Sequence, residues 1–323
     1  MTFLLILGGL ALLIVGGDVM VRGAVKVATR LGVSPLVIGL TLVGFGTSTP
    51  ELVTSVQASF AGSPGIALGN IVGSNIANIL LILGVAALVT PIVVSASALK
   101  RDGAIMVAVA VLFAALSSVL DLSRPLGVIF VALLVAYVVY SFRQEQTSPA
   151  DHGAAFDKGE AAQDVDAGLR PDATTSLVPA LAMAIGGLVL VVIGGKFLVD
   201  GAVALARGYG ISETVIGLTI VAVGTSMPEL VTSVVAAMRR HSDVAFGNVV
   251  GSNIYNILGI GGMTALIAPT SVPAEIVRFD NLVMVGVSAL MFFLAWTGLR
   301  IGRREGGLLI AGYIGYVALI WPK

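Results

Sequence analysis

One segment of the chain occurs twice, 178 residues apart, and this repeat constrains the fold more than any other feature of the sequence. The first copy is Gly46–Glu51 (GTSTPE) and the second is Gly224–Glu229 (GTSMPE). With the same offset, Gly16–Leu80 aligns with Gly194–Leu258 without a gap, and 37 of the 65 aligned positions are identical. A match of this length indicates that the chain consists of two related halves.

The composition places both halves in a membrane. Of the 323 residues, 57% are hydrophobic and 11% are charged, and the mean hydropathy is +1.03. Apolar stretches of about 20 residues, the length that spans a bilayer core, recur along the chain. There is no cysteine, which excludes disulfides and thiolate metal sites, and the formal net charge of zero points to no particular partner. We therefore predict an all-α polytopic membrane protein in contact with the lipid bilayer.

We predict ten transmembrane helices, five in each half. They cover residues 2–21, 33–60, 65–90, 103–120, 125–142, 177–199, 211–237, 244–268, 281–298 and 305–321. Because five is an odd number, the second half enters the membrane from the opposite side, which gives two inverted five-helix repeats, as in many secondary transporters. The predicted units are therefore residues 1–142 and 176–323, joined by a linker at 143–175.

The linker is rich in aspartate, alanine, glycine and glutamine and shows no apolar periodicity, so we expect a flexible, solvated segment. A regulatory cation-binding loop is the alternative. It would use acidic side chains of the linker: Asp151, Asp157, Glu160, Asp164, Asp166 and Asp172. Their spacing does not match a loop motif with ligands at alternate positions.

The basic residues predict how the chain is oriented. With the N-terminus outside, the cytoplasmic segments carry thirteen lysines and arginines and the outer segments carry four. This bias agrees with the positive-inside rule. We therefore expect an integral protein of the cell (inner) membrane. Both termini should lie on the outer side and the linker in the cytoplasm.

Each copy of the repeated motif interrupts a predicted span, the second and the seventh. In the first copy Gly44 and Gly46 weaken the helix and Pro50 removes a backbone donor, so we expect a break. A helix that ends there directs carbonyl oxygens into the gap, and Thr47 and Glu51 share one helical face. Carbonyl, hydroxyl and carboxylate oxygens together suit Ca²⁺, Na⁺ or Mg²⁺.

The same segment also fits a capping box, with Ser48 and Glu51 as its two members and Pro50 in the first turn. Inside a membrane, however, a charged glutamate costs about 2.5–3.5 kcal/mol. A serine alone can cap a helix without that cost. The duplicate at Glu229, which inversion places opposite Glu51, favours an ion site.

Polar residues also repeat in the third and eighth spans, within Gly69–Asn78 and Gly247–Asn256. Two pairs share a helical face through their i, i+4 spacing, Ser74 with Asn78 and Ser252 with Asn256. Hydrogen bonding between helices is the alternative role, and helical facing favours it more for Asn70, Asn75, Asn248 and Asn253 than for Asn78 and Asn256.

Two features of the first and sixth spans suggest how these helices pack. The repeat aligns Asp18 with Lys196 and Arg22 with Asp200, and the swapped signs predict an ion pair between the halves. Paired glycines give each helix a smooth face, which suits close static packing or sliding.

The sequence contains no sign of an enzyme. There is no cysteine, and no histidine lies near a membrane-embedded serine, so we expect no nucleophile–base pair. A phosphate-binding glycine loop and a soluble domain for ATP are also absent from the sequence. We therefore predict a transporter driven by ion gradients, with no cofactor and no nucleic-acid partner.

The paired G-T-S-x-P-E and G-N-x-x-G-S-N motifs resemble the alpha repeats of the calcium/cation antiporter superfamily, and most closely those of the prokaryotic sodium/calcium exchangers. The resemblance covers essentially the whole chain. It implies exchange of Ca²⁺ for Na⁺ by alternating access, in which the first and sixth helices slide across a rigid core.

The resemblance also implies a set of metal ligands. The acidic ligands fall on Glu51 and Glu229, the hydroxyl ligands on Thr47, Ser48, Thr225, Ser226, Ser74 and Ser252, the carbonyl ligands near Gly44 and Ala222, and the amides on Asn78 and Asn256. Some relatives carry an aspartate at one of the amide positions. With asparagine at both, the site holds two carboxylates, which argues against potassium co-transport. Ca²⁺/H⁺ exchange, a passive cation channel and a purely structural membrane protein stay open as alternatives.

Overall fold

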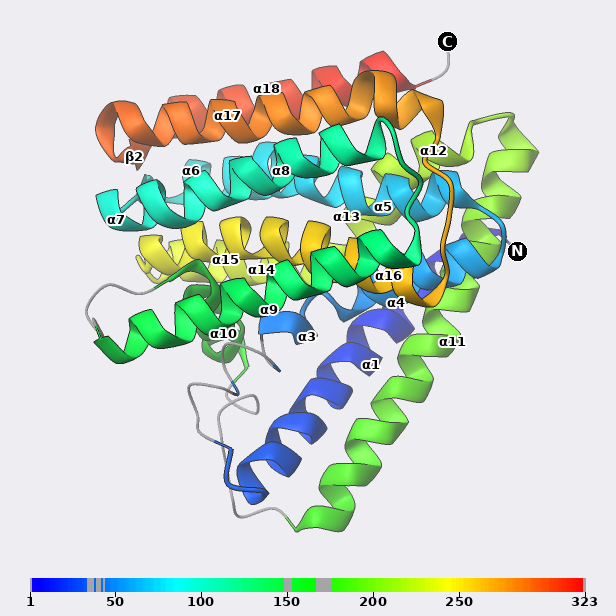
Figure 1. The fold of residues 1–323 in the computed structure, drawn as a ribbon, viewed down its shortest axis with the longest axis horizontal. Coiled ribbons are helices and arrows are strands. Elements are labelled where there is room, and N and C mark those ends of the chain that lie inside the picture. The colour runs from blue at the N-terminus through cyan, green and yellow to red at the C-terminus, as the bar shows by residue number, and fades with distance from the viewer. Residues whose placement is uncertain are drawn as a thin grey trace.

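The computed structural model describes residues 2–33, 38, 42, 44–147, 153–166 and 176–321, and these are mostly helical (Figure 1). The first half comprises α1 Thr2–Arg30, α3 Gly44–Gly46, α4 Thr49–Phe60, α5 Pro64–Ala77, the π-helical turn η2 Asn78–Leu83, α6 Gly84–Val89, β1 Ile92–Val93, α7 Ala96–Ala98, η3 Leu99–Gly103, α8 Ala104–Ser117 and α9 Arg124–Thr147. Helix α10 covers Ala154–Val165.

The second half is also mostly helical. It comprises α11 Leu177–Tyr209, α12 Glu213–Ile216, η5 Gly217–Val221, α13 Ala222–Thr225, α14 Met227–Met238, α15 Ser242–Ile254, η6 Tyr255–Gly261, α16 Gly262–Ile267, η7 Ile276–Asp280, α17 Asn281–Gly298, β2 Arg300–Ile301 and α18 Arg303–Ile320.

Several of these helices match the dimensions of a membrane. Within the described residues, six are long and apolar enough to cross one: Thr2–Arg30, Pro64–Val89, Arg124–Gln144, Leu177–Tyr209, Val244–Ile267 and Ile276–Gly298. A bent pair, Glu213–Thr225 with Met227–Met238, makes up to seven. The count of ten spans stays a prediction.

The predicted break in the second copy of the motif is confirmed, because the chain bends by 49° between Thr225 and Met227. In the first copy, the turn Thr47–Ser48 separates α3 from α4. Pro50 and Pro228 each lie in the first turn of the helix that follows, where a missing backbone donor costs little.

The core is built around two central rods, α5–η2 and α15–η6. All residues of 65–80 and of 244–262 are buried, so both rods are enclosed by other helices on every side. Helix α4 packs on α5, and its counterpart α14 packs on α15. The two polar segments predicted in the third and eighth spans therefore lie inside the protein, not against lipid.

Helices α1 and α11 lie side by side and inclined to the other long helices (Figure 1). Glycines line their contact: a Cβ added at Gly9 would lie 2.8 Å from the carbonyl oxygen of Gly194, and one at Gly16 would lie 2.8 Å from the nitrogen of Val191. The predicted close packing of glycine faces is therefore confirmed, and the two faces meet each other.

The predicted ion pair between the halves is wrong. Arg22 pairs with Asp18 at 3.0 Å, four residues earlier on α1, and Lys196 pairs with Asp200 at 3.0 Å on α11. The i, i+4 spacing within each helix satisfies both charges locally. Arg22 also forms a 2.6 Å ion pair with Asp166, at the end of α10.

The linker departs from the expectation of a flexible, solvated segment. Residues 154–165 form α10, which packs against α15 and α14. Its buried face carries alanines at helical spacing, Ala154, Ala155, Ala161 and Ala162. Because alanine side chains are small, they do not produce a clear apolar periodicity in the sequence. They nevertheless permit close packing against a neighbouring helix. The alternative of a cation-binding loop rested partly on Asp151 and Asp172, which lie outside the described residues.

Candidate functional site

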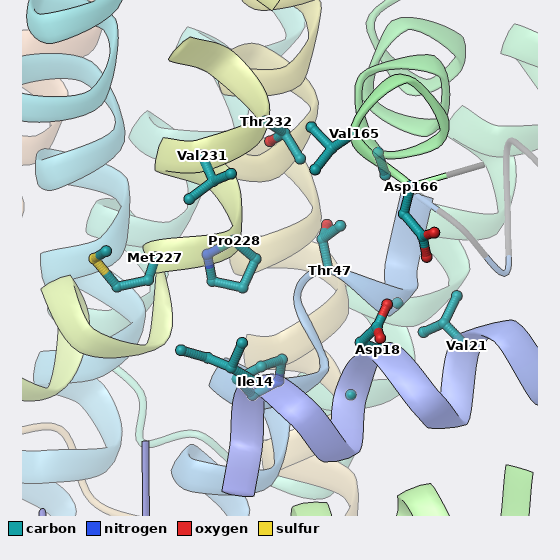
Figure 2. Close-up of a pocket in the computed structure, with 14 residues that line it drawn as sticks. Ile14, Asp18, Val21, Thr47, Val165, Asp166, Met227, Pro228, Val231 and Thr232 are labelled. Carbon is teal, nitrogen blue, oxygen red and sulfur yellow. The ribbon is translucent and has the colours of Figure 1, made fainter. Parts of the chain in front are cut away.

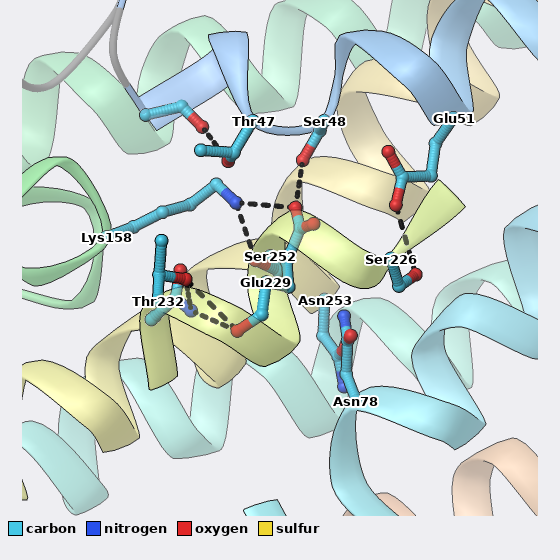
Figure 3. A network of polar contacts seen from close by, with 12 residues as sticks. Thr47, Ser48, Glu51, Asn78, Lys158, Ser226, Glu229, Thr232, Ser252 and Asn253 are labelled. Atoms are coloured by element: carbon cyan, nitrogen blue, oxygen red, sulfur yellow. Dashed lines mark hydrogen bonds and ion pairs between the residues drawn. The ribbon is translucent and has the colours of Figure 1, made fainter. Parts of the chain in front are cut away.

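The two copies of the motif complete each other. The hydroxyl of Ser48 donates to Glu229 Oε1 at 3.2 Å, and the hydroxyl of Ser226 donates to Glu51 Oε1 at 3.0 Å (Figure 3). Each serine therefore contacts the glutamate of the other half. The capping-box interpretation is wrong, because neither serine side chain caps its own helix.

Both carboxylates lie deep in the protein, since Glu51 and Glu229 are each 1% exposed. Their Oε2 atoms have no hydrogen-bond partner among the residues that the structure describes. A buried carboxylate is costly unless a cation or hydrogen-bond donors compensate its charge. Free oxygens on two buried carboxylates favour a cation as their natural partner.

Asn70 and Asn248 position the two glutamates. The amide of Asn70 donates to the backbone oxygen of Glu51 at 3.0 Å and to Ser55 Oγ at 2.9 Å. Asn248 donates to the backbone oxygen of Glu229 at 3.2 Å. The alternative role as polar contacts between helices is therefore confirmed for these two asparagines.

The asparagines predicted as ligands lie in wider, π-helical turns. Asn78 begins η2 and Asn256 is the second residue of η6. Asn78 Nδ2 donates to Asn253 Oδ1 at 3.0 Å, which joins the two halves. Within the described residues, the Oδ1 atoms of both asparagines and the hydroxyl of Ser74 are buried without a partner. These oxygens remain available to a ligand.

The predicted carbonyl ligands lie beside the threonines of the motif. Thr47 Oγ1 lies 3.5 Å from the oxygen of Gly44, and Thr225 Oγ1 donates to the oxygen of Ala222 at 3.3 Å. Thr225 is fully buried, whereas Thr47 is half-buried and lines a cavity of about 300 Å³. This cavity lies between α1, the α3–α4 turn, the end of α10 and α14 (Figure 2).

The site combines two acids with neutral oxygens. In the described part of the chain, no group of three or more histidine, cysteine, aspartate or glutamate side chains could hold a metal. A bound cation would therefore rely on hydroxyl, amide and carbonyl oxygens in addition to the two glutamates. Such all-oxygen ligand sets are typical of Ca²⁺ and Na⁺ sites.

One residue of the site was missed by the sequence analysis. The ammonium of Lys158, on α10, donates to Glu229 Oε1 at 3.2 Å and to Ser252 Oγ at 2.5 Å (Figure 3). Its side chain is fully buried. The sequence could have indicated this residue, because Lys158 shares a helical face with four alanines. It is three residues from Ala155 and Ala161 and four residues from Ala154 and Ala162.

The chain is similar to known ion exchangers along its whole length. The family model described as sodium/calcium exchanger protein matches residues 1–143 and 179–321. Sodium/calcium exchanger MaX1 of Methanosarcina acetivorans is 37% identical, over 99% of this chain and 98% of its own. Inner membrane protein YrbG of Escherichia coli is 35% identical, over 98% and 96%.

Solved structures agree with these relatives. The sodium-calcium exchanger NCX_Mj superimposes with a TM-score of 0.62 at 33% identity, over 98% of this chain and 97% of its own. The match of the family model, the full-length relatives and the structural similarity lead to one conclusion. The chain belongs to the sodium/calcium exchanger family.

Proposed function

We propose that the protein is a secondary antiporter that exchanges Ca²⁺ for Na⁺ across the membrane. The observation that carries this proposal is the reciprocal pairing of Ser48 with Glu229 and of Ser226 with Glu51, which leaves buried carboxylate oxygens free. The names of the relatives support the choice of ions, because MaX1 and NCX_Mj are both sodium/calcium exchangers. The chain acts without a cofactor or ATP.

The proposed ligands are the two glutamates with the surrounding neutral oxygens. They are Glu51, Glu229, Asn78, Asn256, Thr47, Ser48, Thr225, Ser226, Ser74, Ser252 and the carbonyls of Gly44 and Ala222. Two observations on the described residues support this assignment: every ligand side chain except that of Thr47 is buried, and partnerless oxygens occur on Glu51, Glu229, Asn78, Asn256 and Ser74.

Charge balance explains the exchange. The two carboxylates give the site a charge of about −2, which one Ca²⁺ neutralises while taking about 6–8 oxygens. Na⁺ ions use the same oxygens, so their binding expels Ca²⁺ through repulsion and shared ligands. A charged site without a cation is poorly stabilised inside a membrane. The empty transporter therefore rarely switches the site from one side of the membrane to the other, and uncoupled ion leak stays low.

The proposed architecture has ten spans in two inverted repeats. Contacts between loops support the inversion. Strand β1, after the third predicted span, pairs with β2, between the ninth and tenth. The corresponding loop of the second half follows the eighth predicted span. It contacts a different loop, through a bridge between Thr270 and Leu122. The two corresponding loops therefore contact different partners. In the inverted topology, each loop and its own partner lie on the same side of the membrane.

Two further parts of the proposal concern motion and location. The α1–α11 pair, inclined to the other long helices, supports alternating access in which these helices slide across the rest of the molecule (Figure 1). The site is proposed to lie near the midplane of the membrane. The name of YrbG supports an inner-membrane location. On the basis of the positive-inside bias, both termini are proposed to lie outside, and the linker, residues 143–175, to belong to the cytoplasmic side, from which α10 enters the bundle.

The test is Ca²⁺ uptake into proteoliposomes under two imposed gradients. We expect an outward Na⁺ gradient to drive uptake in the native chain, and Glu51→Gln or Glu229→Gln to reduce it at least tenfold, because each removes half of the site's charge. Glu275→Gln is the control, since Glu275 is exposed and outside the site. Full uptake by either site variant contradicts the ligand assignment.

The counter-ion arm separates the alternatives. Uptake driven by a proton gradient but not by a Na⁺ gradient would identify a Ca²⁺/H⁺ antiporter. Uptake without any counter-ion, at rates above carrier turnover, would identify a passive channel.

A further inference from the structure

Lys158 places a positive charge where a transported cation would bind. Its ammonium contacts Glu229, a proposed acidic ligand, and Ser252, a proposed hydroxyl ligand. The ion pair is sealed from solvent, with side-chain exposures of 0% and 2%. A lysine reaches this position only because α10 enters the bundle from the linker (Figure 3).

Helix α10 is anchored at both ends as well as at its centre. At its start, the backbone N–H of Ala154 donates to Asp102 Oδ2 at 3.1 Å, and Asp102 is fully buried beside Tyr137. A carboxylate at a helix N-terminus also interacts favourably with the helix dipole. At its end, Asp166 pairs with Arg22 on α1 at 2.6 Å. The linker helix therefore contacts both the core and one of the two inclined helices.

The two halves differ where α10 docks. On α5, the face at Gly69 and Gly73 is covered by Gly217, Leu218 and other residues of α12–α13. On α15, the matching face at Gly247 and Gly251 is covered by α10: a Cβ added at Gly251 would lie 2.8 Å from the oxygen of Ala154. The linker helix thus covers on α15 the face that α12, η5 and α13 cover on α5. The first-half residues that correspond to α12 and η5, 35–43, lie outside the described residues except for 38 and 42.

The hydrogen bonds near the site show the same asymmetry. In one half, Thr225 donates to Asn70 Oδ1 at 2.9 Å. In the other, Asn248 Oδ1 is buried without a partner in the described residues, and the counterpart threonine, Thr47, contacts Gly44 of its own segment. Among the described residues, the asparagine oxygen without a partner therefore lies on the helix that contacts α10.

We propose that α10 is an autoinhibitory helix and that the ammonium of Lys158 is a tethered competitor of the transported cation. This inference rests on the proposed antiport function and adds a regulatory element to the same site. With Lys158 docked, the site charge rises from about −2 to about −1, which suits no divalent ion. Ca²⁺ must displace Lys158 before it can bind. The family model does not cover this helix, because its match stops at 143 and resumes at 179.

The direct test follows the accessibility of the lysine in the full-length chain. The purified protein is treated with an amine-acetylating reagent, and labelling at Lys158 and at Lys100 is followed by mass spectrometry of peptides. Lys100 is exposed and serves as the internal reference. Without Na⁺ and Ca²⁺, we expect Lys158 to react at least about tenfold more slowly than Lys100, and saturating Ca²⁺ to remove most of this protection.

A site variant extends this test. Glu229→Gln removes the anionic partner of Lys158, so protection should fall even without ions. Equal reactivity of Lys158 and Lys100 in the ion-free native chain would overturn the docked helix. Protection that Ca²⁺ leaves unchanged would overturn the competition, and α10 would then be a fixed structural element.

Transport provides a second readout. We expect Lys158→Gln to lower the Ca²⁺ concentration for half-maximal uptake by about tenfold, because the site no longer has to release its own cation. Lys100→Gln removes an exposed charge and should leave uptake unchanged. Reduced or unchanged uptake by Lys158→Gln contradicts autoinhibition.

The two proposals fail in different ways. If no variant carries Ca²⁺ under a Na⁺ gradient, the antiport proposal fails, whatever the labelling of Lys158. If the native chain exchanges the ions but Lys158 reacts as fast as Lys100, only the autoinhibitory helix is rejected.

Discussion

At the scale of single residues, the site depends on side chains that reach across the two halves. Ser48 and Ser226 each contact the other half's glutamate, and Thr225 donates to Asn70 across the same boundary. Asn70 contacts both halves, because besides accepting from Thr225 its amide donates to the backbone oxygen of Glu51 and to Ser55 on α4. Neither half can assemble the site without the other.

The first residue-scale prediction concerns Asn70. Replacing it with alanine removes its hydrogen bonds to the backbone oxygen of Glu51 and to Ser55 on α4 and the one it accepts from Thr225, so we expect a loss of about 1–3 kcal/mol in stability together with weaker Ca²⁺ binding. Thermal unfolding in detergent, with and without Ca²⁺, measures both effects. Asn75→Ala is the matched control, because the Asn75 side chain donates only within its own helix, to Ile71. Equal losses in the two variants would contradict a positioning role for Asn70.

At the scale of helices, the contact between α1 and α11 depends on which glycine faces the partner. A Cβ at Gly9 would approach the backbone of Leu198 and Gly194 to under 3 Å, whereas one at the adjacent Gly8 meets nothing within 4 Å. The two positions differ by about 100° around α1, so only one of them faces α11. Of these two neighbouring positions, only Gly9 must be glycine for the close contact.

This contact predicts opposite results for neighbouring substitutions. Gly9→Ala overpacks the interface and should lower stability by about 1–3 kcal/mol. Gly8→Ala should be neutral or stabilising by up to about 1 kcal/mol, because alanine favours the helix. Unfolding temperatures and Na⁺-driven Ca²⁺ uptake of the two variants provide the comparison. If Gly9→Ala is as stable and active as Gly8→Ala, then α1 does not pack on α11 as described.

At the scale of the whole molecule, the proposed inverted topology would place matching loops on opposite sides of the membrane. The loop of Ser97 in the first half corresponds to the loop of Ser271 in the second, and both serines are exposed. The two loops pair with different partners, through β1–β2 and through Leu122–Thr270. A parallel repeat would place both loops on the same side.

The absence of cysteine allows a direct test of this topology. We expect a membrane-impermeant maleimide added to intact cells to label Ser271→Cys, and to label Ser97→Cys only after permeabilisation. The native chain should stay unlabelled throughout, and both variants should react once the membrane is opened. Labelling of both cysteines from the outside would exclude inverted repeats.

The sequence by itself determined the membrane class, the two related halves, the interrupted helices and the two glutamates. Composition, span length and helix-breaking residues are local properties, and the duplication made each of them visible twice. The bend after Thr225 and the burial of Glu51 and Glu229 agree with those local signals.

Only the tertiary structure decided which groups meet. Asp18 and Arg22 pair within α1, and the motif serines contact the opposite glutamates instead of capping their own helices. Helix α10 and Lys158 enter the site because contacts at Asp102 and on α15 fix a segment that lacks an apolar period. Local periodicity describes the faces of a helix, but the partner of each face is set by packing between residues far apart in the chain.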